Sequence, residues 1–155
     1  MSIHSAGILL YRFAEGRLEV MLVHPGGPYW AKKDEHAWTI PKGLCEPDET
    51  PLDAARREFR EETGFEAIGE FIELGQLKQP SRKIVHAWAV EQDVDTSRLV
   101  SNSFDLEWPR NSGVIKAYPE ADKGQWFGIE EAREKILRGQ VEFLERLMQT
   151  LFRRQ

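Results

Sequence analysis

Residues 43–65 of this chain read GLCEPDETPLDAARREFREETGF, and the spacing of their charged residues decides the fold. Three glutamates, Glu58, Glu61 and Glu62, stand at positions i, i+3 and i+4, which are neighbouring positions on the surface of a helix. Their side chains would therefore cover one arc of that surface, about one turn long. The stretch predicts a helix that presents three carboxylates to the same region of space.

Signals at both ends of the stretch support a helix. Thr50 is a good N-cap residue, Pro51 suits the first helical position, and Gly64 stands where a left-handed C-terminal cap belongs. The apolar residues with helical spacing are Leu52, Ala55 and Phe59. This apolar stripe lies beside the carboxylate arc, so one edge of the helix can pack on a core while the next edge faces a cleft.

Neighbouring carboxylates repel one another. Like charges at i, i+4 destabilise a helix by roughly 0.2–0.5 kcal/mol per pair, and a bare cluster raises the pKa of one member. A hard divalent cation removes both penalties, because Mg²⁺ takes oxygen ligands from carboxylates and substrate phosphates. The alternative is a solvated acidic face neutralised by Arg56, Arg57 and Arg60.

The whole stretch resembles the Nudix box, G-x5-E-x7-R-E-U-x-E-E-x-G-U, in which U is a bulky apolar residue. Every defined position is matched, with Phe59 and Phe65 as the two U residues. The resemblance implies a loop–helix–loop that binds Mg²⁺ or Mn²⁺ and an enzyme that hydrolyses a nucleoside diphosphate linked to another moiety. It implies metal-ligand and catalytic roles for Glu58, Glu61 and Glu62, supporting roles for Glu49 and Arg57, and a further candidate ligand in the Gly43 carbonyl. We assign the general base to Glu61, with Glu107 or Glu120 as the alternative.

Composition bounds the class of protein. A chain of 155 residues suits a single domain over residues 1–155, and 41% hydrophobic with 30% charged residues is typical of a globular protein. A net charge of −5 argues against generic nucleic-acid binding, so a polyanionic substrate would need a metal or local Lys and Arg as charge partners. The single cysteine, Cys45, excludes an internal disulfide and fits a reducing, cytoplasmic setting. No signal peptide or membrane span is recognisable.

Strand-forming residues surround the box. The predicted strands cover residues 5–13, 18–24, 39–40, 66–79, 84–90, 104–109 and 125–127, and the predicted helices after the box cover residues 129–137 and 140–154. Residues 118–122 read as a turn. With the box helix, these elements imply an α/β fold, the Nudix-type α/β/α sandwich with a mixed β-sheet.

Candidate substrate-binding residues lie before the box. The loop at residues 25–36 carries Tyr29 and Trp30, which could stack on a base, and lysines that could face phosphate. Lys42 stands one residue before the box, a suitable place for a cation that faces phosphate. The alternative is a packed loop with exposed lysines.

The resemblance also implies an acid outside the box that acts as base or as an extra metal ligand. Glu107 is the favoured candidate and Glu120 the second, followed by Glu91 and Asp105, and each could instead be a surface acid. His86 is expected to be a packed strand residue rather than a base.

Two features point to different substrates. Residues 38–43, WTIPKG, resemble the diadenosine-polyphosphate-hydrolase branch of the family, whereas Pro80, 16 residues after Gly64, matches a proline that the family associates with ADP-ribose. We expect a small nucleotide-type substrate, foremost a dinucleoside polyphosphate. ADP-ribose or a nucleotide sugar, a modified nucleoside triphosphate, and a binding module that senses a nucleotide without cutting it remain alternatives, as do a monomer and a homodimer.

Overall fold

The computed structural model describes residues 3–153 of the chain. The strands are β1 (Ile3–Ala14), β2 (Arg17–Pro25), β3 (Lys42–Leu44), β4 (Ile72–Lys78), β5 (Lys83–Glu91), β6 (Ser103–Glu107), β7 (Ile115–Pro119) and β8 (Ala121–Gly128). The helices are α1 (Pro51–Thr63), α2 (Ile129–Lys135) and α3 (Val141–Leu151), with short 3₁₀ turns at η1 (Thr96–Arg98) and η2 (Arg138–Gln140).

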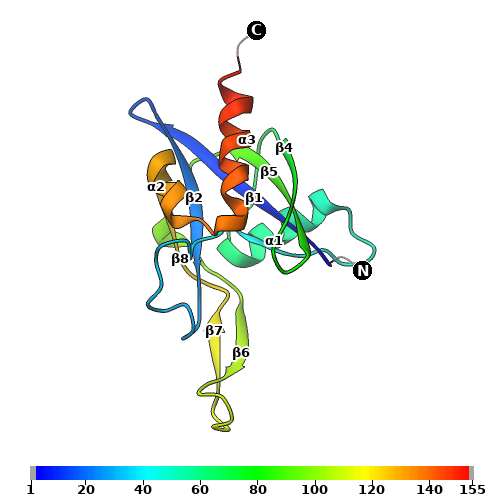
Figure 1. Cartoon of the computed structure of the whole chain (residues 1–155), viewed down its shortest axis with the longest axis vertical. Coiled ribbons are helices and arrows are strands. Elements are labelled where there is room, and N and C mark those ends of the chain that lie inside the picture. Colours follow the sequence, from blue (N-terminus) through cyan, green and yellow to red (C-terminus); the bar gives the residue numbers. More distant parts are fainter. Residues whose placement is uncertain (1–2, 154–155) are drawn as a thin grey trace.

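The main sheet is mixed, as the sequence predicts. Its strand order is β4-β5-β1-β2-β8, and β3 pairs with the first part of β1. Strands β1 and β5 run parallel, whereas the other neighbours are antiparallel. Strands β6 and β7 form a separate two-stranded sheet that extends away from the rest of the molecule (Figure 1).

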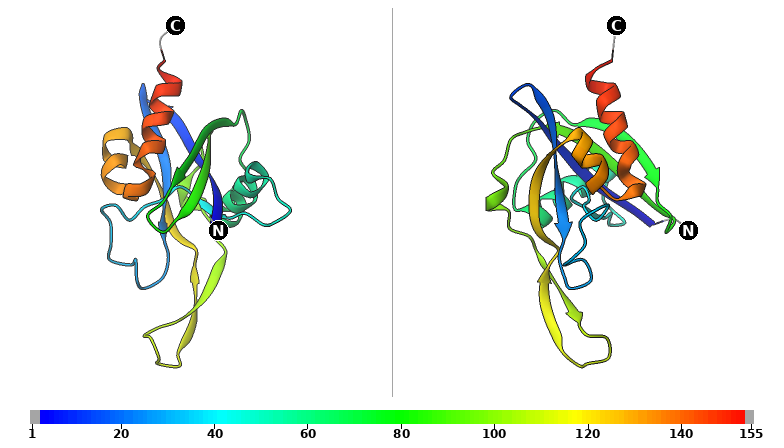
Figure 2. Two further views of the ribbon diagram at one scale, coloured as in Figure 1. Left: turned by 45° about the vertical axis from the view of Figure 1, so that its right-hand side comes forward. Right: turned by 60° about the vertical axis from the view of Figure 1, so that its left-hand side comes forward.

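Helices cover both faces of this sheet, and the predicted α/β/α sandwich is confirmed (Figure 2). On β1, Ala6, Ile8 and Leu10 join the core beneath α1, while Leu9 and Tyr11 join the core beneath α2 and α3. Successive side chains of a strand point to opposite faces, so a strand buried on both faces needs a continuous apolar run. This explains the unbroken apolar stretch in the first predicted strand.

Several predicted boundaries change. Residues 39–40 form no regular strand, because Thr39 makes only an isolated bridge to Val23 and the Ile40 amide donates to the side chain of Gln140. The chain pairs with β1 only after Pro41, as β3. Of residues 66–79, the strand β4 takes only the second half.

The segment after β6 was also predicted incompletely. Tyr118 and Pro119, expected in a turn, end β7, because their partners across the hairpin are Phe104 and Ser103. The last helix ends at Leu151, and the predicted end of that helix at residue 154 lies outside the described residues. No helix within residues 3–153 is both long and apolar enough to cross a membrane.

Candidate functional site

Helix α1 carries the site, and its ends are as predicted. The Thr50 side chain accepts a hydrogen bond from the Asp53 amide at 3.2 Å, Pro51 is the first helical residue, and Gly64 ends the helix in the left-handed region at φ 79°. The side chains that anchor the helix to the sheet are Ala54, Ala55 and Phe59, all fully buried. Burial of this edge holds the carboxylate arc in place relative to the sheet.

The carboxylate of Glu58 lies against the backbone of Gly43. A Cβ built on Gly43 would come within 2.0 Å of Oε1 of Glu58, so any side chain at this position would force the Glu58 carboxylate to move. Gly43 lies in β3, opposite Ala6 of β1, so the sheet holds this glycine next to the helix. The Glu58 carboxylate thus packs against the Gly43 backbone, and carboxylate and carbonyl oxygens are the ligand types that a hard divalent cation takes.

Arg57 links four parts of the site. Its Nε and one terminal nitrogen donate to the two carboxylate oxygens of Glu49 at 2.6 and 2.9 Å, and the same terminal nitrogen donates to the Leu44 carbonyl at 3.0 Å. Its other terminal nitrogen donates to Glu58 at 2.8 Å and to both oxygens of Glu61 at 3.3 Å. The planar guanidinium therefore ties the loop before α1 to two of the helix carboxylates.

Among the carboxylates that pair with Arg57, that of Glu61 is the most accessible to solvent. Its side chain is 37% exposed, against 15% for Glu58. Its carboxylate faces Arg57, and within residues 3–153 no three His, Cys, Asp or Glu side chains stand in a ready-made metal-binding group. The three box glutamates share one helix and one side of it, and hard oxygen donors of this kind fit Mg²⁺ or Mn²⁺.

The carboxylate of Glu62 lies beside Lys42, in surroundings that are less polar than water. Burial raises the pKa of Glu62 to about 8, while the Lys42 side chain and backbone oppose the shift and the charges of Glu58 and Glu120 add to it. Burial also lowers the pKa of Lys42 and raises that of Glu58. Groups that resist their charged forms in this way are typical of functional sites.

The structure separates the two acids that were considered outside the box. Glu120, between β7 and β8, contributes to the raised pKa values of both Glu58 and Glu62, so its charge lies within reach of theirs. Glu107 ends β6, and its carboxylate accepts hydrogen bonds from the amides of Asn111 and Gly113 in the hairpin turn. Glu107 therefore organises the turn of the β6–β7 hairpin, and Glu120 is the acid that approaches the box.

Tyr29 and Trp30 contact each other and help to form a pocket. Their rings meet edge to face at 5.1 Å, and the Lys33 ammonium lies 4.1 Å from the centre of the Tyr29 ring. Tyr29 is 57% exposed, whereas Trp30 packs in part on the core beneath α2 and α3. The pocket beside them has a volume of about 330 Å³, and its other walls include Phe104, Leu106 and Glu120.

A second pocket, of about 390 Å³, is lined in part by Lys42. Its lining brings together three basic side chains, those of Lys42, Lys83 and Arg138. Pro80 also lines it, so the proline noted in the sequence lies next to a residue of the candidate site. The sequence analysis missed Lys83 and Arg138, because both are at least 41 residues away from Lys42 in the sequence. Only the turn between β4 and β5 and the 3₁₀ turn η2 bring them near Lys42.

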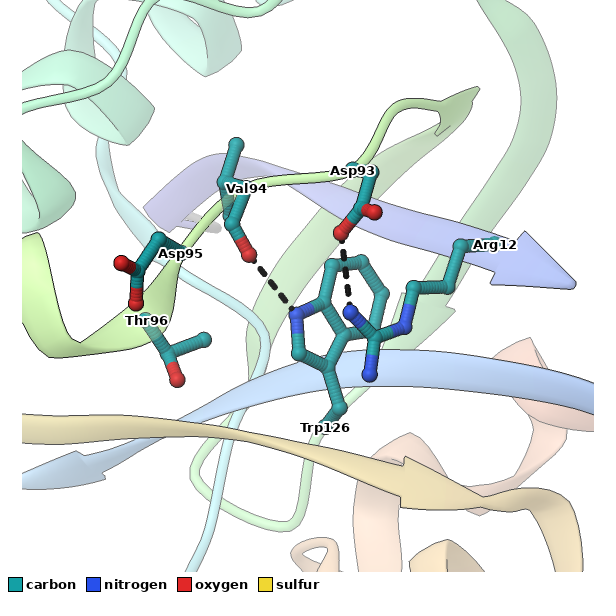
Figure 3. Close-up of a pocket in the computed structure, with 6 residues that line it drawn as sticks. All are labelled: Arg12, Asp93, Val94, Asp95, Thr96 and Trp126. Atoms are coloured by element: carbon teal, nitrogen blue, oxygen red, sulfur yellow. Dashed lines mark hydrogen bonds and ion pairs between the residues drawn. The ribbon is translucent and has the colours of Figure 1, made fainter. Parts of the chain in front are cut away.

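A third hollow, of about 540 Å³, contains none of the predicted residues. Figure 3 shows Arg12 from β1 lying across Trp126 from β8, with Asp93 and Val94 above them. The Arg12 guanidinium is 4.2 Å from the ring centre and pairs with Asp93 and Glu19, while the Trp126 indole donates to the Val94 carbonyl. Because these polar groups already bind one another, the contacts in this hollow are explained by structure and we assign it no ligand.

Two other side chains with reactive groups are His86, in β5, and Cys45, which lies within the box stretch near Glu49 and Glu58. His86 is in the middle of β5, as predicted, and stacks on His4 with ring centres 5.1 Å apart. Burial raises the pKa of the Cys45 thiol, which disfavours the reactive thiolate. Neither residue has the surroundings of a nucleophile or base for this site.

Comparisons with known proteins agree with this description. A family model described as "NUDIX domain" matches residues 1–147. The bis(5'-nucleosyl)-tetraphosphatase [asymmetrical] of Mus musculus is 28% identical over 144 residues, which cover 85% of this chain and 83% of the mouse protein. An RNA pyrophosphohydrolase of Bartonella henselae is 38% identical over 68 residues, 41% of this chain and 36% of that protein.

Solved structures show the same fold. A binary complex of Ap4A hydrolase from C. elegans superposes with a TM-score of 0.62 at 22% identity, covering 96% of this chain and 97% of that one. The NUDIX domain of Shewanella oneidensis NrtR, crystallised with ADP ribose, gives a TM-score of 0.68 at 11% identity, with 97% and 89% coverage. At sequence identities of 22% and 11%, the structural similarity supports a shared fold and nothing more.

Proposed function

We propose, from the premise that this chain belongs to the NUDIX domain family and is a hydrolase of that family, that it cleaves a P–O–P linkage in a dinucleoside polyphosphate. The observation that carries this proposal is the close contact between the Glu58 carboxylate and the backbone of Gly43, with Glu62 and the charge of Glu120 nearby. The name of the mouse relative supports the choice of a dinucleoside polyphosphate.

The residues that would hold a divalent cation are Glu58, Glu61 and Glu62, together with the Gly43 carbonyl. A bound Mg²⁺ or Mn²⁺ supplies charge neutralisation at the phosphoryl group and lowers the pKa of water. Arg57 keeps Glu58 and Glu61 in position through its hydrogen bonds and is itself fixed by Glu49. The protein therefore contributes both the ligands and the frame that orients them.

Hydrolysis requires a base for the attacking water. Glu61 is the candidate, because its side chain is on the carboxylate arc and is the most accessible member of the Arg57 pairs. As the water oxygen bonds to phosphorus and the bridging P–O bond breaks, the Glu61 carboxylate takes the proton. Glu120 is the alternative base, since its charge reaches the same carboxylates.

Two pockets each contain a residue whose charge acts on the α1 carboxylates, Glu120 in one and Lys42 in the other, and their linings suit different parts of an extended substrate. The pocket with Lys42, Lys83 and Arg138 offers cations to a polyphosphate chain. The pocket beside Tyr29 and Trp30 offers aromatic rings to a base. A dinucleoside polyphosphate carries both kinds of group.

We further propose that residues 1–155 act as one catalytic domain on a free nucleotide in the cytoplasm. The single cysteine, with its raised thiol pKa, is compatible with a reducing compartment. Whether the active species is a monomer or a homodimer is measured by sedimentation of the purified protein.

A substrate panel tests the proposal directly. Diadenosine polyphosphates, ADP-ribose, a nucleotide sugar and nucleoside triphosphates are incubated with Mg²⁺ or with EDTA, and the products are separated by chromatography. We expect Mg²⁺-dependent hydrolysis with a preference for the diadenosine polyphosphates. A preference for ADP-ribose would move the assignment to the sugar-linked class, and no hydrolysis of any compound would contradict the catalytic role.

Variants identify the residues. Glu61→Gln and Glu62→Gln remove one charge each, and we expect each to lower the rate by about 10²–10⁴-fold, as for a lost base or ligand. The matched control is Glu70→Gln, at an exposed glutamate outside the site, which should keep the wild-type rate. Activity within a few-fold of wild type in both site variants would exclude these roles.

A further inference from the structure

The pocket beside Tyr29 and Trp30 has a second wall that the sequence did not indicate. Its first wall is the loop after β2, with Gly26, Gly27 and the two aromatic residues. Its second wall is β6 of the protruding hairpin, which contributes Phe104 and Leu106. The hairpin is therefore one side of a pocket whose other residues belong to the body of the protein.

Backbone contacts hold the two walls at a set separation. The Gly26 amide donates to the Glu120 carbonyl at 3.0 Å, and a Cβ on Gly26 would meet the Pro119 carbonyl oxygen, so the loop lies directly on the end of β7. A Cβ on Gly27, at φ 96°, would lie 3.3 Å from the tip of the Phe104 ring. The two glycines let the loop approach the hairpin closely, and the pocket is formed without a bound ligand.

The hairpin presents a distinct face to this pocket. Phe104 and Leu106 stand two residues apart on β6 and so point to the same side, where Phe104 faces Tyr118 of β7 with ring centres 6.2 Å apart. A two-stranded hairpin is at best marginally stable alone. The apolar face of this one is held against the glycine loop rather than against the main core.

Glu120 connects the pocket to the carboxylates of α1. It lines the pocket, and the backbone of Asn102 joins it to α1, since the Glu120 amide donates to the Asn102 carbonyl at 2.7 Å and the Asn102 amide donates to the Glu61 carbonyl at 2.8 Å. A ligand seated between the aromatic walls would therefore have its outer end beside the candidate catalytic groups. Flat aromatic rings and apolar walls suit a planar heterocycle, and the charged groups beyond suit the phosphates attached to it.

We propose that Phe104 and Leu106 of the β6–β7 hairpin, opposite Tyr29 and Trp30, form the binding site for a nucleobase of the substrate and determine the preference for base-containing compounds. This proposal rests on the proposed function for the identity of the reaction. The binding of a base is a separate property, and it can be measured without catalysis.

Calorimetry in EDTA measures this binding with two matched probes, AMP and ribose 5-phosphate, which differ by the base. We expect wild-type protein to bind AMP at least about tenfold more tightly than ribose 5-phosphate, the difference that a base–aromatic contact supplies. Phe104→Ala and Leu106→Ala should each reduce that preference towards unity. The control is Phe13→Ala, since Phe13 is an exposed phenylalanine on β1 that contacts Tyr11 and Phe152 instead.

Kinetics supply the second measurement. With an adenine-containing substrate, Phe104→Ala and Leu106→Ala should raise KM by about tenfold and leave kcat within a few-fold, while circular dichroism confirms that both variants fold. Equal affinity of wild-type protein for the two probes, or an unchanged AMP preference in both folded variants, would overturn the base site even if hydrolysis proceeds. Base-dependent binding without any hydrolysis would instead contradict the proposed function and leave the base site standing.

Discussion

The Glu58 carboxylate occupies the space that a side chain at Gly43 would fill. The Cβ position of Gly43 is 2.0 Å from Oε1 and 2.6 Å from Oε2 of Glu58, so a side chain at Gly43 would displace the Glu58 carboxylate from its present position. A residue of β3 and a residue of α1 thus depend on each other for their placement, and this dependence leads to the first prediction.

Gly43→Ala should displace the Glu58 carboxylate and lower the hydrolysis rate by about 10²-fold, the cost expected when a catalytic group moves by about 1 Å. The measurement is kcat/KM at saturating Mg²⁺. Gly128→Ala is the control, because a Cβ there meets nothing within 4 Å. Equal rates for the two variants would show that the close approach of Gly43 and Glu58 has no part in activity.

Arg57→Lys keeps the charge and removes the planar set of donors that reaches Glu49, Glu58 and Glu61. We expect a loss of about 10–100-fold in metal affinity or activity, typical of a residue that orients ligands. Calorimetric titration with Mn²⁺ and the rate assay measure the two effects. Arg60→Lys, at an exposed arginine on the same helix, should behave like wild type. A wild-type result for Arg57→Lys would mean that charge alone is sufficient there.

Glu120 and Glu107 can be distinguished by the same substitution. Because Glu120 acts electrostatically on Glu58 and Glu62, Glu120→Gln should lower the rate by at least about tenfold. Glu107→Gln should loosen the hairpin turn, where Glu107 accepts two backbone hydrogen bonds, and alter the rate far less. The comparison is made by steady-state kinetics, and the reverse order of effects would favour Glu107 as the acid outside the box.

Phe59 anchors the box helix, since it is fully buried in the core beneath α1. Phe59→Ala should lower the free energy of unfolding by about 3–5 kcal/mol, through lost burial and a residual cavity. Urea denaturation provides the value. Phe152→Ala removes the same atoms from a residue that is 54% exposed and should cost less than about 1 kcal/mol. Similar losses for both variants would contradict the anchoring role.

The His4–His86 pair should make stability depend on pH. The pKa of His86 is lowered, first by burial and then by the nearby His4, while Glu73 opposes the shift. A lowered folded-state pKa means that the unfolded state binds more protons below about pH 6.5, so stability is complete above that pH and falls as the pH drops towards the folded-state value. His86→Gln should lose Tm less steeply than wild type between pH 7 and pH 5. Parallel Tm curves would exclude the effect.

Residues 43–65 alone were sufficient to predict the capped helix, its three carboxylates and the family. All of these depend on local spacing and capping, which are properties of consecutive residues. The burial of β1 on both faces agrees with its continuous apolar run, which is likewise a property of consecutive residues. The prediction of a strand at residues 39–40 was wrong, because the Ile40 amide binds the side chain of Gln140. This partner is 100 residues away, so local sequence does not reveal it.

Only the tertiary structure decided which distant groups meet at the site. The charge of Glu120 acts on the carboxylates of α1, whereas the carboxylate of Glu107 binds backbone amides in the hairpin turn. The two acids differ because β7 ends beside the main sheet, while the hairpin turn lies away from it (Figure 1). Phe104 and Leu106 join Tyr29 and Trp30, and Lys83 and Arg138 join Lys42, through strand pairing and turns. Such long-range contacts are set by how the layers pack, and packing is a property of the whole chain.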